Sequence, residues 1–481
     1  MRLPTLLLSV VLGAIPPFST ISGSQTSPLP TVSGAKLFSG LAAACDIEAD
    51  KPGSPALNSA NIAPEGFVAL FNGKDLDGWW GVTNWGGKGN DINPRKYVGL
   101  GEEALETRRN ATAAAVARHW LARDGELVND GAGPFLATTK NYGDFELIVD
   151  YKTVPKADSG VYLRGYPQVQ IWDSTNPREF KNGAQKGSGA LWNNSREGRF
   201  PLNKADLPFG EWNRLRILMV GSRVWVWLNG KPTVLGAVLE DYLDRRTPIL
   251  PRGPILLQTH GGEIRWRNIF IREIPPETAN AILAARAPAG FNPIFDGVSL
   301  EGWAGATNAV AIQDGAIAWL PQKGGTLHTT REFSDFSMRF EFKLPPGANN
   351  GVVVRYPGKG DGAYAGMCEI QVLDDNYEKV RKEKIDPRQA HGSAYGMVAA
   401  ARGYQRPYGE WNWQEITVRG TKVRVELNGF VILDADLSTV KQFMHKRPHP
   451  GKDRKSGFIG FAGHNDRIQF RNISVREIPA K

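Results

Sequence analysis

The same series of short motifs occurs twice along this chain of 481 residues, in the same order each time. FNGKDLDGW at Phe71 returns as FDGVSLEGW at Phe295, and IRWRNIFIREIP at Ile264 returns as IQFRNISVREIP at Ile468. Between these ends lie the matched pairs GDFELIVDYK and SDFSMRFEFK, SGVYLR and NGVVVR, QVQIWD and EIQVLD, and VWVWLNG and VRVELNG. Collinear matches of this kind identify a duplication, so we expect two tandem copies of one domain. We place the copies at residues 63–275 and 290–479, with a linker at 276–289.

The composition favours β-structure in both copies. The chain contains 54 Gly, 32 Pro and 10% aromatic residues, which are typical of many short strands joined by tight turns. Its length suits two domains of about 200 residues each, and its 41% hydrophobic content is enough for two packed cores. We therefore expect an all-β architecture.

The first copy contains an insertion. The offset between matched segments is 224 residues at Phe71 but 190 at Asp124, so the first copy holds 34 additional residues between Trp79 and Asp124. Within them, EEALETRRNATAAAVARHW is rich in alanine and has no interior Gly or Pro, which predicts a surface helix. The helix is either a lid or a surface decoration. The Ala-rich segment from Pro275 to Pro288 predicts a helical or extended linker.

The strand VWVWLNG of the first copy alternates between two faces. Its aliphatic residues face one way and Trp225 and Trp227 the other, and Asn-Gly predicts a hairpin turn. The second copy has Arg424 and Glu426 at the tryptophan positions. We expect this second face to be wet in the second copy, and to be covered in the first by the inserted helix, the partner domain or a ligand.

A second strand carries polar groups in both copies. QVQIWD and EIQVLD alternate apolar and polar residues, so each strand presents two polar side chains on one face, about 7 Å apart. These polar residues are Gln168 and Gln170 in the first copy and Glu369 and Gln371 in the second, followed by Asp173 and Asp374. Such a row can hydrogen-bond sugar hydroxyls while nearby aromatic rings stack on the sugar. The alternative is the solvent-exposed face of an ordinary sandwich strand.

Histidine is scarce, with 7 residues in the chain, so its placement is informative. His260 and His464 occupy equivalent positions before the last strand of each copy, where a histidine serves as a general base or bonds a turn. His391 is specific to the second copy, because Lys186 stands near the matching place. A divalent metal near Asp374 and Asp375 is left open.

Other features concern the compartment and the partners. Arg2 and the apolar run from Leu6 to Ile15 indicate a signal peptide at residues 1–25, followed by a flexible lead at 26–62. We expect an exported protein, periplasmic or extracellular, without a transmembrane segment. The net charge of +9 includes no long Lys/Arg block, which argues against a nucleic-acid partner. Cys45 and Cys368 are too few for a disulfide framework, although the position of Cys45 leaves lipid attachment open.

These motifs together resemble those of a known family. FNGKDLDGW, GDFELIVDYK, SGVYLRGYPQVQIWDS, KGSGALWNN, PFGEWNRLRI and the ending LQTHG to RNIFIREIP are similar to the bacterial 3-keto-disaccharide hydrolases, also described as 3-keto-glucoside-1,2-lyase and 3-keto-2-hydroxy-glucal hydratase domains. The resemblance implies two tandem concanavalin-like (laminin-G-like) jelly-roll sandwiches. It also implies an oligosaccharide or glycoside substrate already oxidised at C3, which is cleaved by C2 deprotonation, elimination at C1 and hydration.

The resemblance gives the polar residues roles. In the second copy, the catalytic candidates are Glu369 as acid, His464 or His391 as base, and Arg355 as electrophile. In the first copy His260 and Arg164 persist, but Gln168 replaces the acid. The candidates for substrate binding are Arg164, Gln168, Gln170, Asp173, Trp192, Gln371, Asp374 and Tyr395. The alternative is a non-catalytic carbohydrate-binding or cell-envelope protein, and the oligomeric state stays open.

Overall fold

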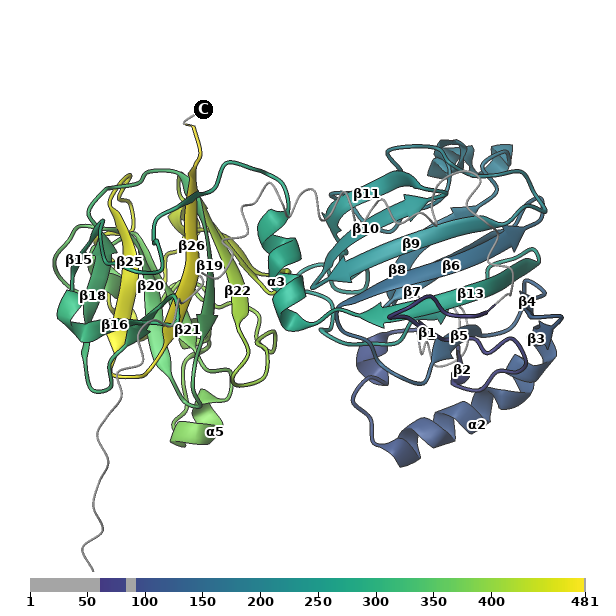
Figure 1. The fold of residues 1–481 in the computed structure, drawn as a ribbon, viewed down its shortest axis with the longest axis horizontal. Coiled ribbons are helices and arrows are strands. Elements are labelled where there is room, and N and C mark those ends of the chain that lie inside the picture. The colour runs from purple at the N-terminus through teal and green to yellow at the C-terminus, as the bar shows by residue number, and fades with distance from the viewer. Residues whose placement is uncertain (1–60, 84–91, 480–481) are drawn as a thin grey trace, which may run out of the picture.

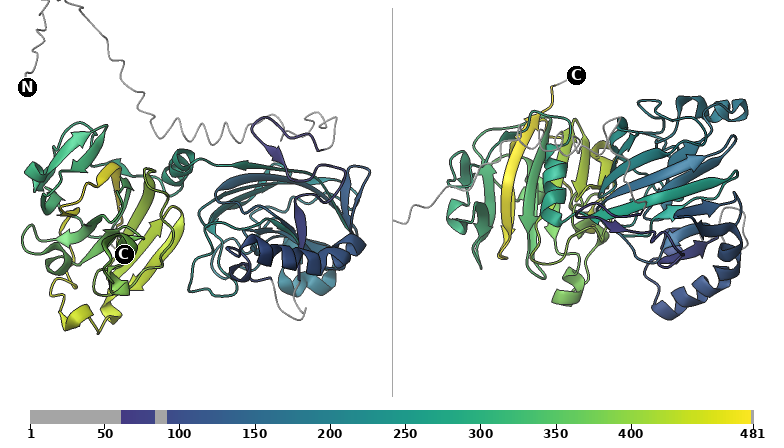
Figure 2. Two further views of the ribbon diagram at one scale, coloured as in Figure 1. Left: turned by 90° about the horizontal axis from the view of Figure 1, so that it is seen from below. Right: turned by 45° about the vertical axis from the view of Figure 1, so that its right-hand side comes forward.

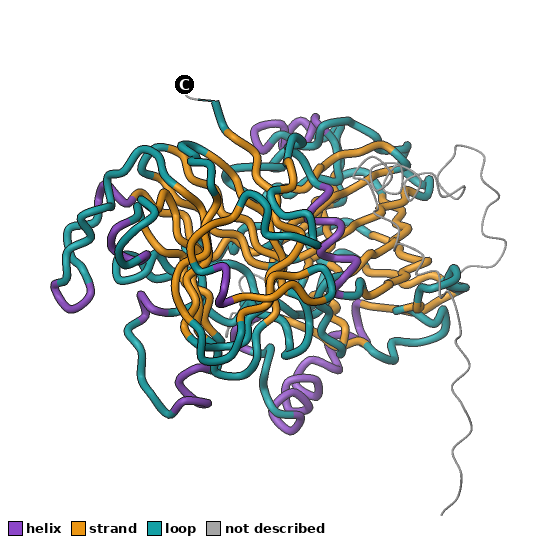
Figure 3. The backbone as a smooth tube through the Cα atoms, turned by 60° about the vertical axis from the view of Figure 1, so that its left-hand side comes forward, coloured by secondary structure: helices purple, strands orange, loops and turns teal. Residues whose placement is uncertain are grey.

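The computed structural model describes residues 61–83 and 92–479, which form two β-rich halves joined by the helix α3 (Pro276–Ala285) (Figure 1). The expected signal peptide, nearly all of the lead and Cys45 lie outside the described residues. Strands form the sheets of both halves, and loops and helical segments connect them (Figure 3). No helix in the described part of the chain is long and apolar enough to cross a membrane.

In its described residues the first copy forms two antiparallel sheets. The larger has the order β11-β10-β9-β6-β13-β4-β3, with β1 on β13: Lys231–Val238, Arg223–Leu228, Asn213–Val220, Phe145–Thr153, Ile264–Glu273, Glu126–Asn129, Trp120–Arg123 and Val68–Ala69. The smaller has the order β2-β5-β12-β7-β8: Trp79–Val82, Phe135–Thr138, Leu256–Leu257, Asp158–Leu163 and Tyr166–Trp172.

The second copy repeats this topology in its own described residues. The larger sheet has the order β24-β23-β22-β19-β26-β17-β16, with β14 on β26: Phe430–Asp436, Lys422–Leu427, Asn412–Arg419, Phe336–Lys343, Gln469–Glu477, Ala316–Trp319, Val310–Gln313 and Asn292–Pro293. The smaller has the order β15-β18-β25-β20-β21: Trp303–Gly305, Gly324–Thr329, Phe458–His464, Asn349–Tyr356 and Cys368–Leu373. Two copies of a jelly-roll sandwich, the expected fold, are thereby confirmed.

Both halves also contain helical segments. The α-helices are α2 (Glu102–His119), α3, α4 (Gly362–Ala365) and α5 (Tyr377–Arg381) in the described residues. The 3-10 turns are η2 (Pro94–Lys96), η3 (Pro177–Asn182), η4 (Ala184–Lys186), η5 (Thr307–Ala309), η6 (Pro387–Gln389), η7 (Leu437–Thr439) and η8 (Met444–Lys446).

The inserted helix α2 covers the outer face of the smaller sheet in the first copy. Thr112 of α2 donates its hydroxyl to the carbonyl of Gly81 on β2 over 3.1 Å. Buried side chains of the sheet and of the insertion form one cluster there: Trp80, Val82, Phe135, Ala137, Tyr162 and Leu256 with Ile92 and Tyr97. The predicted surface helix is confirmed, and it acts as a fixed cover on this face.

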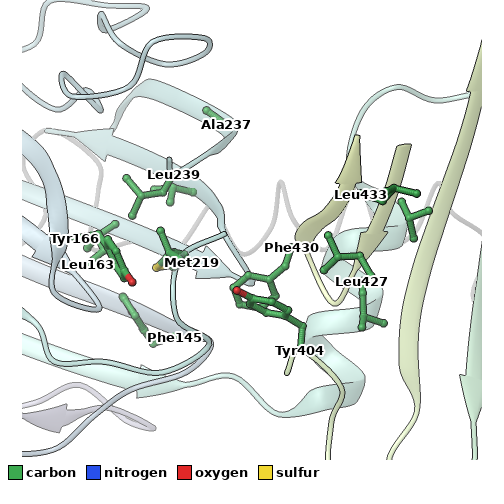
Figure 4. Close-up of a cluster of buried hydrophobic side chains, with 14 of the residues drawn as sticks. Phe145, Leu163, Tyr166, Met219, Ala237, Leu239, Tyr404, Leu427, Phe430 and Leu433 are labelled. Atoms are coloured by element: carbon green, nitrogen blue, oxygen red, sulfur yellow. The ribbon is translucent and has the colours of Figure 1, made fainter. Parts of the chain in front are cut away.

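One apolar core continues from the first copy into the second. Phe145, Leu163, Tyr166 and Met219 belong to the same buried cluster as Tyr404, Leu427, Phe430 and Leu433 (Figure 4). The Tyr404 hydroxyl also donates to the carbonyl of Pro248 in the first copy over 3.1 Å. The two halves therefore pack against each other through apolar side chains as well as through the linker.

The tryptophan face of β10 is covered by α3 and the second copy, not by α2. The helix α3 lies between the two halves (Figure 2). Trp225 packs with Ala279 and Leu283 of α3 and with Trp413 of β22. The expectation of a wet face at the matching place in the second copy is wrong for Glu426. This carboxylate is buried at the interface, where Arg223 donates to it from β10 and Arg286 contacts it at 3.0 Å.

Candidate active site

A polar pocket of about 390 Å³ opens on the outer face of the smaller sheet in the second copy. Its floor comes from strands β18, β20, β21 and β25, which contribute Thr326, Asn349, Glu369, Gln371 and His464. Its walls come from the α4 loop, from Tyr377 to Gln389, and from Tyr395 and Arg447. Strand alternation therefore places the predicted Glu369–Gln371 row in a cavity.

Glu369 lies at the bottom of this pocket, with 4% of its surface exposed. Burial raises the pKa of its carboxyl group to about 8, and the negative charge of Asp361 raises it further in the same direction. Gly351 on β20 makes room for this carboxyl group, since a β-carbon there would collide with it. At neutral pH the group is therefore mainly a neutral carboxylic acid, which can donate a proton.

Gln371 follows Glu369 on the same face of β21. Its amide nitrogen donates to Oδ1 of Asn349 over 2.5 Å, while its carbonyl oxygen is buried and has no partner among the described residues. Such an unpaired acceptor beside a pocket is costly unless a ligand or a neighbouring proton satisfies it. Gln371 is thus placed to accept a hydrogen bond from inside the pocket.

His464 ends β25 at the edge of the pocket, with an exposed ring. Partial loss of hydration lowers its pKa, and the carboxylates of Asp361 and Asp466 oppose this shift. The ring is therefore mainly neutral near pH 7 and able to accept a proton. Tyr395 lies on the opposite side of β21, where its backbone N–H donates to the Glu369 carbonyl over 2.9 Å and burial raises the pKa of its hydroxyl group.

The outer wall is a stack of rings that sequence reasoning missed. Tyr364 of α4 lies under the guanidinium of Arg447, 3.4 Å from the ring centre, and against the ring of His449 at 4.6 Å. His449 is buried and bonds the Ala363 carbonyl over 3.1 Å, which fixes α4 in place. A sequence signal did exist. The offset between copies grows from 191 at Ser159 to 201 at Gln168, so ten additional residues of the second copy contain α4.

His391 lies outside the pocket and is fully enclosed. Its Nε2 donates to Gln414 over 2.9 Å, its Nδ1 accepts from the Leu373 backbone at 3.4 Å, and burial lowers its pKa. The matching residue is Ser188 rather than Lys186, because the Ser188 hydroxyl likewise accepts from the backbone of Trp172 over 3.2 Å. Both ring nitrogens are engaged, so His391 supports the strand edge.

Arg355 and Arg164 are also buried away from the pocket. Arg355 donates to the carbonyls of Ser334, Gly420 and Arg454 and pairs with Asp335 at 2.8 Å. Arg164 donates to the Gly143 carbonyl and pairs with Asp144 at 3.0 Å. The two arginines hold equivalent loops together, and neither reaches the pocket.

The aspartates that follow the polar strands cap turns. Asp173 accepts from the backbone of Lys156 and Thr175, and Asp374 from the backbone of Gly347 and from the Tyr408 hydroxyl. Asp375 accepts from the Gly403 backbone over 3.0 Å. Within residues 61–83 and 92–479, no group of three or more His, Cys, Asp or Glu side chains is placed to hold a metal ion.

In the first copy the polar side chains of this strand hydrogen-bond to each other and to neighbouring side chains. Gln168 donates to the carbonyl oxygen of Gln170, Gln170 donates to Asp158 over 2.7 Å, and Asp158 bonds His260 at 2.8 Å. The hydrogen bond that His260 donates to Asp158 raises the pKa of His260. Trp192 stands where the second copy has Tyr395, and it packs edge-on to Trp172.

Larger side chains occupy the floor of the first copy. Phe135, Tyr162 and Gln258 stand at the positions of Thr326, Val353 and Ala462 in the second copy, and the first two belong to the cluster under α2. The same sheet face therefore carries a pocket in one copy and a packed cover in the other.

The chain is similar to several known proteins. A curated 3-keto-disaccharide hydrolase from Bacteroides thetaiotaomicron is 29% identical over 228 residues, covering 39% of this chain and 78% of the relative. A solved structure of a candidate glycosyl hydrolase from Parabacteroides distasonis is 28% identical and covers 40% of this chain and 100% of its own, with a TM-score of 0.34. A Bacillus subtilis carbohydrate-binding module is 10% identical and covers 37% of this chain and 96% of its own, with a TM-score of 0.25. The family described as 3-keto-alpha-glucoside-1,2-lyase-like domain matches residues 66–272 and 290–476, so the chain belongs to this family and contains two tandem copies of its domain.

Proposed function

We propose that the second copy is a glycoside-cleaving hydrolase that acts on 3-keto-glycosides. The family and the relative from Bacteroides thetaiotaomicron support the class of substrate. The observation that carries the proposal is the neutral carboxylic acid of Glu369, which shares a pocket with the proton acceptor His464. The pocket volume of about 390 Å³ falls in the range of small-molecule sites.

In this proposal His464 removes the proton from C2 of the sugar, which the ketone at C3 makes acidic. The electron pair moves onto the C3 oxygen, for which the Tyr395 hydroxyl and the Arg447 guanidinium are donors in the pocket lining. The resulting enolate expels the C1 substituent, whose oxygen takes the proton of Glu369. Water then adds its hydroxyl group to C1 and returns a proton to Glu369, while His464 returns its proton to C2.

The first copy has no equivalent acid in this scheme. Gln168 cannot supply a proton to a leaving group, and its amide already bonds Gln170. The covered sheet face and the closed hydrogen-bond chain suit a domain that supports the second copy. We therefore assign turnover to the second copy.

The test is turnover of a 3-keto-glucoside by the full chain and by the variant Glu369→Gln. Loss of the general acid should lower kcat by about 100-fold or more. A matched control is Glu332→Gln, which makes the same change at an exposed carboxylate that accepts from Ser456. An undiminished rate in Glu369→Gln would disprove the assigned role.

A further inference from the structure

The amide of Gln371 has the same orientation as its counterpart Gln170, and in the first copy chemistry dictates that orientation. Gln170 sits beside Asp158, which can only accept a hydrogen bond, so the amide nitrogen must point at Asp158 over 2.7 Å. Its carbonyl oxygen then points along the strand and accepts from Gln168. Asn349 occupies the place of Asp158 in the second copy and receives the amide nitrogen of Gln371.

The acceptor filled in the first copy is left unpaired in the second. The Gln371 carbonyl oxygen is buried without a partner among the described residues, because Glu369 replaces the amide donor of Gln168. Gly351 lies directly across from Gln371 in the β20–β21 register, and the Glu369 carboxyl group leans over Gly351. Gln168 also lies over Gly160, the partner of Gln170, but with its Cβ and Cγ atoms. The Glu369 carboxyl group therefore lies over the residue that pairs with Gln371, on the face of β21 that carries the Gln371 side chain.

We propose that Asn349 and Gln371 are positioning residues that hold Glu369 in its protonated form, with Asn349 turning the Gln371 carbonyl oxygen toward the acidic proton. This inference rests on the proposed function for its catalytic meaning. A carbonyl acceptor favours the neutral acid, whereas an amide N–H donor in the same place would favour the carboxylate. By accepting from the amide nitrogen of Gln371, Asn349 holds this amide in the orientation that stabilises the neutral form of Glu369.

Other groups around Glu369 also affect its protonation, independently of the Gln371 amide. The negative charge of Asp361 and burial both favour the neutral acid. The titratable or charged side chains that line the same pocket are Asp361, Tyr364, Tyr377, Glu383, Tyr395, Arg447 and His464, and Arg355 and Cys368 lie behind the strand. None of them contacts the amide of Gln371 in the hydrogen bonds of the described residues, so a change at Asn349 isolates the amide orientation.

The experiment compares Asn349→Leu with Asn349→Asp in the full chain. Leucine frees the Gln371 amide to turn its N–H groups toward Glu369, which lowers the pKa of the carboxyl group. Aspartate enforces the wild-type orientation, as Asp158 does in the first copy, and adds a negative charge. We expect the alkaline limit of kcat to move to lower pH by about one unit in Asn349→Leu and to stay or move higher in Asn349→Asp. Asn349→Ala repeats the test with a smaller side chain if the leucine variant does not fold.

A second measurement separates this inference from the proposed function. Infrared titration of the substrate-free chain follows the carbonyl band of a protonated carboxyl group. The band is assigned to Glu369 if it is absent in Glu369→Gln. The positioning role is supported if the titration midpoint is lower in Asn349→Leu and is not lowered in Asn349→Asp. This result supports it even if no 3-keto-glycoside is turned over. Equal midpoints in wild type and both variants overturn the positioning role even if turnover is confirmed.

Discussion

Glu369 shows how one buried side chain links stability to pH. Its carboxyl pKa is about 8 in the folded chain and 4.5 as an ordinary carboxyl group, so between these values the folded state holds more protons than the unfolded state. The free energy of unfolding therefore falls as pH rises through this window. The acid that suits catalysis is, by the same physics, a source of instability at alkaline pH.

We expect Glu369→Gln to be more stable than the wild type at pH 8, because glutamine has no charge to bury. The difference in unfolding free energy between variant and wild type should grow across the window by at most about 1.4 kcal/mol per pH unit. Chemical denaturation of both proteins at pH 5 and pH 8 measures it. Parallel pH dependence of the two proteins would show that Glu369 ionises normally.

His391, in contrast to Glu369, is a buried titratable side chain whose contacts are structural. Its replacement by Ala leaves the Gln414 side-chain oxygen and the Leu373 N–H without partners and opens a void beside Phe342. We expect the unfolding free energy to fall by about 2–4 kcal/mol, while the pH limits of kcat stay in place. A shifted pH profile with unchanged stability would instead assign a catalytic role to this ring.

At the scale of elements, the α4 loop builds one wall of the pocket. Tyr364 packs against Arg447 and His449, and its ring meets the Tyr395 ring edge-to-face, with 6.2 Å between the ring centres. A rigid aromatic edge of this kind suits contact with the C–H groups of a sugar. The ten-residue insertion thus contributes binding surface rather than proton transfer.

We expect Tyr364→Ala to raise KM about tenfold with a smaller effect on kcat, because uniform binding is lost. Tyr364→Phe keeps the ring and should restore most of the wild-type KM. Steady-state kinetics on a 3-keto-glucoside distinguishes the two variants. An effect of Tyr364→Phe as large as that of Tyr364→Ala would place the hydroxyl group, not the ring, in the binding interaction.

At the scale of the whole molecule, a buried charge network joins the copies. Glu426 of β23 is contacted by Arg223 of β10 and by Arg286 after α3, and Arg286 also reaches Glu415 at 2.9 Å. Despite burial, the two guanidinium groups lower the pKa of Glu426 to about 2. The contribution of this carboxylate to stability is therefore present above pH 4.5 and is lost as pH falls toward 2.

We expect Glu426→Ala to destabilise the chain by about 3–5 kcal/mol, since it leaves two guanidinium groups facing each other at a buried interface. Thermal unfolding at neutral pH measures the loss, and the exposed Glu277→Ala on α3 serves as the control. A variant as stable as the control would show that the interface is hydrated and that the copies pack loosely.

Sequence patterns alone predict the duplicated topology and the placement of Glu369 and Gln371 on one face of a strand. These follow from repetition and from the two-residue period of a strand, both of which are local. The helical insertion also follows from local pattern. In each case the prediction needed no knowledge of distant contacts.

Which polar groups line the pocket depends on contacts between segments that are far apart in the sequence. Arg164, Arg355 and His391 are buried by segments far away in sequence, and the burial of Glu426 and Trp225 requires the second copy and α3. The raised pKa of Glu369 likewise depends on enclosure by the α4 loop and on Asp361. Burial and electrostatic surroundings are sums over the whole fold, so a residue's type and position in a strand cannot fix them.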